Sequence, residues 1–342
     1  GGETINAGAL WTQGKICGAT TLMTNPNTSR TTLNVVVLAG GPSAEAEVSH
    51  RSAAQVHAAL QDLGHASQVV ELDGNCLGTL LKIRPDVVFP ALHGPPGEDG
   101  TVQGALEILG VSYVGSDVRG SALAMDKAVA KSIFRRHGLP VSDDRVVTQG
   151  TELNDAVIDI ERCLGRQVAI KPLNAGSAIG VRLLPQGGDL ASALAQSLQY
   201  GDCLVEPFIV GKEITVGVLH TKDSLQAHPV IEIRTAQDQW YDYQNRYTEG
   251  SSEHIIPADL APAVLADLQR IAVHAHTALG LRDLSRADFI VSADEQITLL
   301  EVNTLPGMTP TSLYPDGAAA LGYDFAALVD LLVRAAFARG AN

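Results

Sequence analysis

Apolar residues alternate between short continuous runs and helix-spaced stretches from residue 33 onward. An apolar run at 33–41 ends in glycines and predicts a buried strand, a stretch at 46–64 predicts a helix, and runs at 65–73 and 84–94 predict two more strands. This order of strand, helix and strand is typical of a doubly wound parallel sheet. Ligands bind such sheets at the carboxyl ends of the strands. The loops "AGGPSAEAE" and "ALHGPPGEDG" are therefore expected to converge there.

The rest of the chain predicts shorter helices and antiparallel strands. A helix is expected up to about Gly138, followed by strands around a single helix at 189–200, and later helices are expected at 260–280 and 324–340. The expected strands are 167–173, 180–184, 203–209, 212–220, 225–234, 253–258, 284–292 and 297–303. The pattern predicts a chain of α/β and α+β class with three domains.

Four segments follow from this pattern. The N-terminal α/β domain is placed at 31–117, a central α+β subdomain at 118–212, and a C-terminal α+β subdomain at 213–342. Residues 1–30 lack the compact apolar core of a signal peptide and are expected to be a disordered extension or an expression remnant.

Composition narrows the class of protein. The 342 residues are 45% hydrophobic and 18% charged, which is ordinary for a soluble globular protein, and the formal net charge is −14. This charge argues against general binding to nucleic acid or anionic membranes. No apolar run is long enough to span a bilayer. The four cysteines have no C-x-x-C spacing, so a zinc site and a disulfide framework are not indicated, and a reducing cytoplasm is expected.

An acid and an amide stand two residues apart in the run "LLEVNTLPGMT". The segments 284–292 and 297–303 are separated by a short loop and predict a hairpin. If the loop is symmetric, Asp288 faces Glu301 and Arg286 faces Asn303, with all four side chains on one face. Two carboxylates about 4 Å apart repel by roughly 4 kcal/mol at an effective dielectric constant near 20. A cation is therefore expected.

Carboxylate and amide oxygens are the ligands that Mg²⁺ prefers, often completed by phosphate oxygens. A protonated carboxyl pair or a solvent-facing edge remains an alternative. Arg286 can stabilise developing negative charge beside a metal and a phosphate, or it can form a structural salt bridge to one of the acids.

The chain has neither the Walker motif G-x-x-x-x-G-K-[ST] nor the dinucleotide-binding motif G-x-G-x-x-G. A nucleotide would therefore need a different phosphate-binding loop. The loop "NAGSAIG", with Gly176 and Ser177, could bring backbone N–H groups to phosphates, although a plain hairpin loop fits equally well. Lys171 lies within an apolar strand and indicates a function, whereas Lys127 on a helix would by itself be assigned to solvent.

Together these segments resemble the ATP-grasp superfamily, and closely its D-alanine:D-alanine ligase family. The motifs "GGPSAEAEVS", "ALHGPPGEDGTVQGALE", "GSALAMDK", "YDYQNRY", "RADF" and "LLEVNTLPGMT" occur in the family's order. The resemblance runs from about residue 33 to the C-terminus. It implies an ATP-grasp fold in which two α+β subdomains sandwich ATP.

The resemblance also implies a role for each matching residue. For metal it implies Asp288, Glu301 and Asn303 as ligands of two Mg²⁺ ions, with Mn²⁺ as a possible substitute; for ATP, Lys127, Lys171, Gly176, Glu206, Phe208, Ile209, Glu213 and Arg246; for catalysis, Glu45, Ser177, Tyr247, Arg286 and Gly307; and for the amino acid substrates, His93, Ser312 and Leu313.

The implied activity is the ligation of two D-alanine molecules through an acyl phosphate, for peptidoglycan precursors and hence cell shape. A mobile lid is expected at "WYDYQNRYTEGSS", and the family is commonly dimeric. Ligases making D-alanyl-D-lactate or D-alanyl-D-serine are alternatives, as is a nucleotide-binding regulator without catalysis. A nicotinamide dehydrogenase is disfavoured by the missing glycine fingerprint.

Two departures from the family pattern are visible. Arg246 replaces the usual lysine of the lid motif, and the usual "EGSSVG" of the central loop is "NAGSAIG", which places alanine at 175 and 178. Fewer hydrogen bonds between this loop and the lid would predict faster lid opening and a raised KM for ATP.

Overall fold

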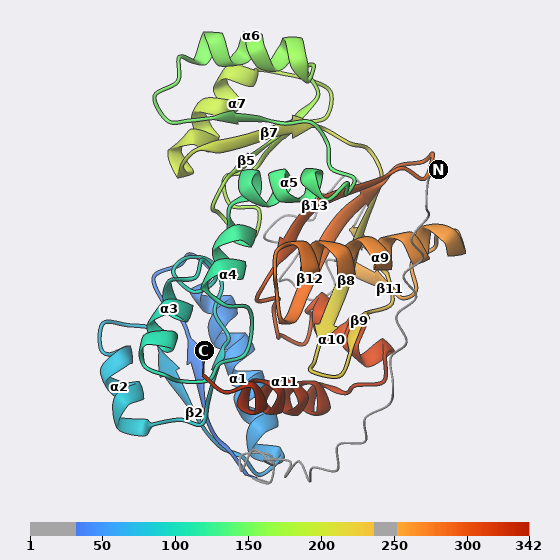
Figure 1. Cartoon of the computed structure of the whole chain (residues 1–342). Coiled ribbons are helices and arrows are strands. Elements are labelled where there is room, and N and C mark those ends of the chain that lie inside the picture. Colours follow the sequence, from blue (N-terminus) through green and yellow to red (C-terminus); the bar gives the residue numbers. More distant parts are fainter. Residues whose placement is uncertain (1–31, 236–251, 342) are drawn as a thin grey trace, which may run out of the picture. The chain divides into compact units, whose positions relative to one another are not determined.

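Three β-sheets organise this computed structural model, which describes residues 32–235 and 252–341 (Figure 1). No helix in these two ranges is both long and apolar enough to cross a membrane. Their three cysteines, Cys76, Cys163 and Cys203, are free thiols.

The first sheet is parallel, with the order β2-β1-β3. Its strands are β1 (Asn34–Ala39), β2 (Ala66–Glu71) and β3 (Val87–Pro90). Alternate residues of β1 enter two different cores: Val35 and Val37 pack with α1 and α11, whereas Val36 and Leu38 pack with α2 and α3. Helices therefore cover both faces of the sheet, as the doubly wound pattern predicted. These helices are α1 (Ala46–Asp62), α2 (Cys76–Ile83), α3 (Thr101–Ile108) and α11 (Phe325–Arg339).

The second sheet is antiparallel, with the order β4-β7-β5-β6. Its strands are β4 (Arg145–Val147), β5 (Val168–Pro172), β6 (Arg182–Leu184) and β7 (Cys203–Pro207), and its helices are α6 (Leu153–Cys163), α7 (Leu190–Ser197) and the short 3₁₀ helix η2 (Leu198–Tyr200). The prediction of a single helix here is wrong, because α6 packs beside α7 over the same core. Only Ala156 and Ile160 of α6 are fully buried, so its apolar stripe is narrow and easily missed.

The third sheet is antiparallel and has six strands in the order β11-β10-β8-β12-β13, with β9 also paired to β8. The strands are β8 (Lys212–His220), β9 (Leu225–Ala227), β10 (Ile231–Thr235), β11 (Ser252–Ile255), β12 (Asp283–Val291) and β13 (Ile297–Asn303). The single strand expected at 225–234 is divided into β9 and β10 around Pro229, which has no N–H to give to a ladder.

Helices pack on this sheet from both sides. α5 (Lys127–Arg136) and α9 (Pro262–Ala278) share one core with β8, β12 and β13. α10 (Leu313–Ala320) lies on the other face, where the Tyr314 hydroxyl donates to the carbonyl of Val218. Helix α4 (Val118–Met125) comes directly before α5 and ends at Asp126. The Asp126 carboxylate accepts hydrogen bonds from two N–H groups at the start of α5.

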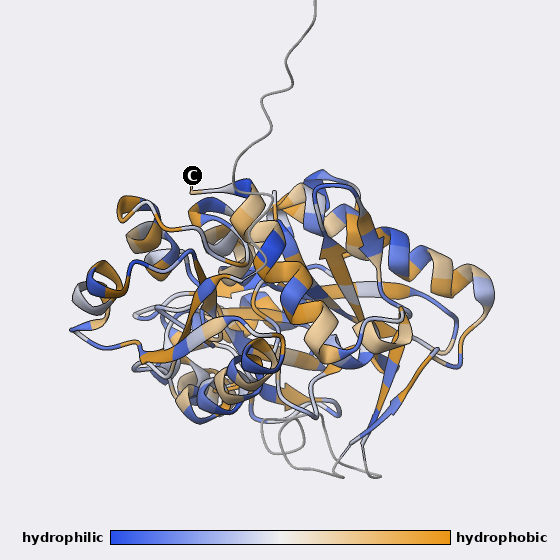
Figure 2. Ribbon diagram, turned by 90° about the horizontal axis from the view of Figure 1, so that it is seen from below, coloured by the Kyte–Doolittle hydropathy of each residue, from blue (hydrophilic) through white to orange (hydrophobic). Residues whose placement is uncertain are grey.

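α11, the last helix, belongs to the core of the first sheet. Its residues Leu328, Leu332 and Ala336 are fully buried in the same cluster as β1 and α1. At its end, Arg339 forms an ion pair with the buried Asp283 at the start of β12. Figure 2 shows hydrophobic residues concentrated in the strands and alternating with polar residues along the helices.

Candidate active site

The predicted pairing of acids across the last hairpin is present. Asp288 faces Glu301 and Arg286 faces Asn303 in the β12–β13 ladder. The Arg286 guanidinium donates to both oxygens of Asp288, at 2.9 and 2.7 Å, and the Thr215 hydroxyl donates to Asp288 Oδ1 at 2.6 Å. The salt bridge from Arg286 to one of the acids, considered as an alternative from the sequence, is therefore present, and it joins two residues of the candidate site.

A β-bulge produces this register. On the loop side, Phe289 pairs with Leu299, which is one residue out of step with the symmetric loop assumed from the sequence. Leu300 is the extra residue, so the register at Asp288 agrees with the prediction although the loop is not symmetric. The bulge also explains why Leu299 and Val302, three residues apart, both enter the core.

Two adjoining cavities meet at this hairpin. A small cavity of about 90 Å³ and a large cavity of about 620 Å³ share Lys127, Ala175, Ser177 and Glu301 in their walls. The small cavity is also lined by predicted site residues, namely Glu45, His93, Gly176, Arg286, Asn303, Gly307, Ser312 and Leu313. The large cavity also has Lys171, Glu206, Phe208, Ile209, Glu213 and Asp288. The structure thus gathers every predicted site residue that it describes.

Glu45 connects two loops from different sheets. The residue is 4% exposed, and its carboxylate accepts a hydrogen bond from the Ser177 hydroxyl. A Cβ at Gly176 would lie 2.6 Å from Glu45 Oε2, so only glycine allows this close approach. Ser177 and Ala178 both have positive φ, at 46° and 58°, a strained conformation of the kind that concentrates at functional sites.

The two loops of the first sheet converge as predicted. A Cβ at Gly94 would lie 3.0 Å from Glu45 Oε2, and the Ser49 hydroxyl donates to the carbonyl of Ala91. His93 is buried, and burial together with the charge of Arg286 lowers its pKa to about 4, so its imidazole is neutral at pH 7.

Glu98, in the wall of the small cavity, was not singled out from the sequence. Its carboxyl accepts a hydrogen bond from the Gly94 N–H. Burial and the neighbouring Glu45 raise the pKa of this carboxyl to about 8, which makes it neutral at pH 7. Its position in the loop "HGPPGEDG" could have marked Glu98 as a candidate site residue. Its burial beside Glu45 could not be predicted, because it depends on tertiary contacts.

The two predicted lysines, Lys127 and Lys171, contact carboxylates, and Lys127 also contacts a backbone carbonyl. Lys127 Nζ donates to the carbonyl of Ala175 at 2.7 Å and lies 3.6 Å from Glu301 Oε2, so this side chain is not assigned to solvent. Lys171 Nζ lies 2.8 Å from Glu206 Oε2. The other Glu206 oxygen is held by Lys131, a second residue that sequence reasoning missed.

The segment after β13 turns into the start of α10. Ser312 is the N-cap residue of this helix, and its hydroxyl accepts from the Thr309 N–H at 3.0 Å. A Cβ at Gly307 would lie 2.7 Å from Ser312 Oγ, which accounts for glycine at that position. Arg246, Tyr247 and most of the expected lid lie outside the described residues.

Comparisons with known proteins agree with this arrangement. The family model described as D-ala D-ala ligase C-terminus matches residues 133–334, and the model for the N-terminus matches residues 78–116. A D-alanine–D-alanine ligase of Synechococcus sp. (strain JA-3-3Ab) is 43% identical over 90% of this chain and 95% of its own length. One from Moorella thermoacetica is 41% identical, over 88% and 98%. This chain belongs to the D-alanine–D-alanine ligase family.

Solved structures show the fold of the same ligase family. A D-alanine–D-alanine ligase of Bacillus anthracis complexed with ATP has a TM-score of 0.76 and 29% identity, covering 90% of this chain and 98% of the other. The VanG D-Ala:D-Ser ligase of Enterococcus faecalis has the same TM-score and identity, covering 89% and 99%. The ATP-grasp fold expected from the sequence is confirmed.

Proposed function

We propose that this chain joins two D-alanine molecules to D-alanyl-D-alanine, using ATP and releasing ADP and phosphate. The observation that carries the proposal is the position of Glu301, in the wall between a small polar cavity and a large cavity containing Lys171. This arrangement supports a reaction in which an amino acid in the small cavity meets the terminal phosphate of a nucleotide in the large one.

The nucleotide would bind in the large cavity. Phe208 and Ile209 supply apolar walls for the adenine, Glu206 and Glu213 supply acceptors for base and ribose, and Lys171 supplies positive charge for phosphates. Gly176 and Lys127 would meet the phosphates at the boundary between the two cavities, and Arg246 of the lid motif is proposed to add a further cation.

Asp288, Glu301 and Asn303 fit a magnesium site. The described residues contain no group of three His, Cys, Asp or Glu side chains arranged for a metal, so the set rests on two carboxylates and one amide. Hard oxygen donors of this kind suit Mg²⁺, and phosphate oxygens commonly complete its shell. Asn303 Oδ1 accepts from the Leu305 N–H at 2.9 Å and still has a second lone pair. When bound, Mg²⁺ neutralises charge on the phosphates.

In the first step the carboxylate of one D-alanine would attack the γ-phosphorus to give an acyl phosphate and ADP. Glu45 is the proposed anchor for the ammonium of this D-alanine, because it is a buried carboxylate oriented by Ser177. His93 lies in the same wall and, as a neutral imidazole, adds no competing positive charge.

In the second step the amine of the other D-alanine would attack the acyl carbon, and phosphate would leave. Arg286 and the N–H of Gly307 are proposed to stabilise the tetrahedral oxyanion. Ser312 and Leu313, at the N-terminus of α10, are proposed to hold the carboxylate of the second D-alanine, where the helix dipole favours an anion. Tyr247 is proposed to orient the amine together with Glu45 and Ser177.

The biological setting follows from the product. The dipeptide would serve peptidoglycan precursor synthesis in the cytoplasm, and a homodimer is the proposed assembly. Similarity to a D-Ala:D-Ser ligase keeps D-serine as a second acceptor to be tested.

The test is phosphate release from ATP and Mg²⁺ with D-alanine, and with D-alanine mixed with D-serine, D-lactate or L-alanine, followed by mass analysis of the products. We expect release with D-alanine alone and D-alanyl-D-alanine as the main product of each mixture. Absence of phosphate release with D-alanine would sink the proposal, and a mixed dipeptide or depsipeptide as the main product would change the acceptor. Omission of Mg²⁺ should stop the reaction, and sedimentation analysis tests the dimer.

A further inference from the structure

Lys131 is a fully buried lysine outside both cavities. It lies on α5, and its side chain is 2% exposed. Its helix neighbours Ala130 and Phe134 belong to the core of the six-stranded sheet. The Lys131 ammonium instead reaches Glu206 on β7 of the four-stranded sheet.

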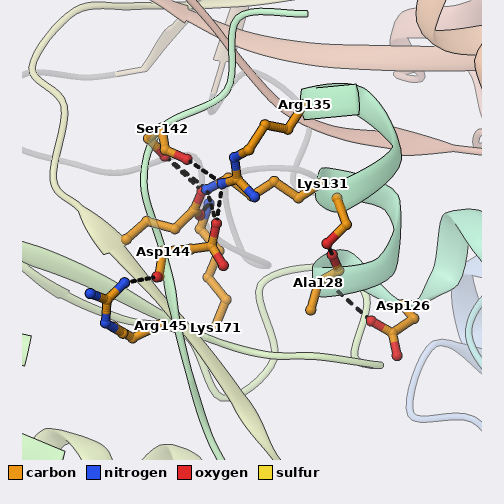
Figure 3. A network of polar contacts seen from close by, with 10 residues as sticks. Asp126, Ala128, Lys131, Arg135, Ser142, Asp144, Arg145 and Lys171 are labelled. Carbon is orange, nitrogen blue, oxygen red and sulfur yellow. Dashed lines mark hydrogen bonds and ion pairs between the residues drawn. The ribbon is translucent and has the colours of Figure 1, made fainter. Parts of the chain in front are cut away.

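Polar groups surround the Lys131 ammonium. It donates to Glu206 Oε1 and, at 2.9 Å, to Ser142 Oγ, and it lies 3.8 Å from Asp144 Oδ1. Ser142 Oγ also donates to Glu206 Oε1, at 3.0 Å. Figure 3 shows Lys131, Ser142, Asp144 and Lys171 gathered in this network.

Glu206 therefore has two lysine partners, one on each oxygen. The residue is 2% exposed, and burial alone would raise the pKa of its carboxyl; Lys171 and Lys131 outweigh burial and lower this pKa to about 2. The two lysines differ in position. Lys171 lines the large cavity, whereas Lys131 approaches Glu206 from the α5 side and is absent from the cavity wall.

The proposed function requires Lys171 to serve phosphates. A lysine that turns from Glu206 toward a phosphate would leave a buried carboxylate without that partner, which is unfavourable unless another cation remains. Lys131 is already in place and does not line the cavity, so it can remain on Glu206 throughout.

We infer that Lys131 is a positioning residue of the nucleotide site, which keeps Glu206 ionised and oriented so that Lys171 is released to bind phosphate. This inference rests on the proposed use of ATP. An ionised Glu206 only accepts hydrogen bonds, so it favours a base with an amino group at position 6 over one with a carbonyl oxygen there. Lys131 thereby also supports selection of adenine over hypoxanthine.

The test combines turnover with binding measured without turnover. In Lys131→Gln we expect the KM for ATP to rise about tenfold or more, as for loss of one charge-assisted hydrogen bond, while kcat changes by less than about threefold. Calorimetry should show that the preference for ADP over IDP falls. Arg136→Gln, an exposed site on the same helix, is the matched control and should change neither quantity.

An unchanged KM and an unchanged ADP preference in folded Lys131→Gln would overturn the inference. If that variant does not fold, Lys131→Gln combined with Glu206→Gln removes both charges of the pair. Because Lys131 acts through Glu206, the double variant should bind ADP as the single Glu206→Gln variant does. Much weaker ADP binding by the double variant would also overturn the inference. ADP binding by the unaltered chain does not depend on D-alanine, so failure of the ligase proposal is a separate result.

Discussion

Asp288 and Glu301 face each other across the β12–β13 ladder because Leu300 bulges out of β13. Arg286 and Thr215 donate hydrogen bonds to Asp288, and Lys127 forms an ion pair with Glu301. Each of the two acids therefore has a positively charged side chain beside it. Of these three neighbours, Arg286 and Lys127 also line the cavities.

Replacement of Glu301 by alanine should abolish turnover without unfolding the protein. We expect kcat to fall by about a thousandfold or more, because a proposed magnesium ligand is lost. Stability should change by less than about 1 kcal/mol, because the lost contact with Lys127 is offset by relief of repulsion from Asp288. Phosphate release and thermal melting measure the two effects. Glu161→Ala, an ion-paired surface site on α6, is the control, and retained activity in Glu301→Ala would refute the metal assignment.

Deletion of Leu300 should be tolerated better than deletion of Val302. Without Leu300 the ladder becomes regular, and Phe289 can still pair with Leu299 while Asp288 pairs with Glu301. Without Val302, the amide of Asn303 would enter the core at a cost of about 3 kcal/mol or more. Circular dichroism melts should show a folded first variant and a strongly destabilised second one. Equal destabilisation by the two deletions would contradict this account of the bulge.

Glu98→Gln should stabilise the protein at alkaline pH. Because burial and Glu45 raise the pKa of the folded carboxyl to about 8, from an unfolded value near 4.5, the Glu98 contribution to stability is complete below pH 4.5 and is lost as pH rises to 8. Glutamine mimics the neutral acid, so the variant should gain stability on the order of 4 kcal/mol at pH 8, and little at pH 4.5.

Urea unfolding at pH 5, 7 and 8.5 checks this prediction, with Glu47→Gln, an exposed site on α1, as the control. We expect Glu98→Gln to keep measurable ligase activity, because the hydrogen bond from Gly94 has an acceptor in the amide oxygen. A variant less stable than the parent chain at pH 8.5 would show that the pKa of folded Glu98 is not raised.

Ala178→Ser should lower the KM for ATP. Ala178 lines the large cavity beside Ser177, and a hydroxyl there restores a hydrogen-bonding group that the family pattern has. One neutral hydrogen bond predicts a decrease of roughly threefold. Ala54→Ser, an exposed site on α1, controls for the added hydroxyl. An indistinguishable KM would count against the predicted effect of this departure.

The hydrophobic pattern of the sequence predicted the helices and strands with strong periodicity. It also predicted the four site residues of the last hairpin. The hairpin register placed Arg286, Asp288, Glu301 and Asn303 together, although the bulge at Leu300 could not be read from alternation. The shorter helices α2, α3, α4 and α10, and strand β4, were not predicted, because each is eight residues or fewer and gives little periodic signal.

Lys131 shows why other site residues escaped sequence reasoning. It stands four residues after Lys127 on a helix, and that spacing alone indicates only a shared face. Its burial results from Ser142 and Glu206, which lie 11 and 75 residues further along the chain. Partners at such separations are visible only in the folded structure.

The place of α11 in the first core has a consequence for synthesis of the chain. Strand β1 and helix α1 are made well before α11, but the core that they form with Leu328, Leu332 and Ala336 needs α11 to be made. A ribosome therefore has to translate every residue from β1 to α11 before that apolar face can be covered. During translation this face of the first sheet remains exposed to chaperones and proteases until α11 has been made.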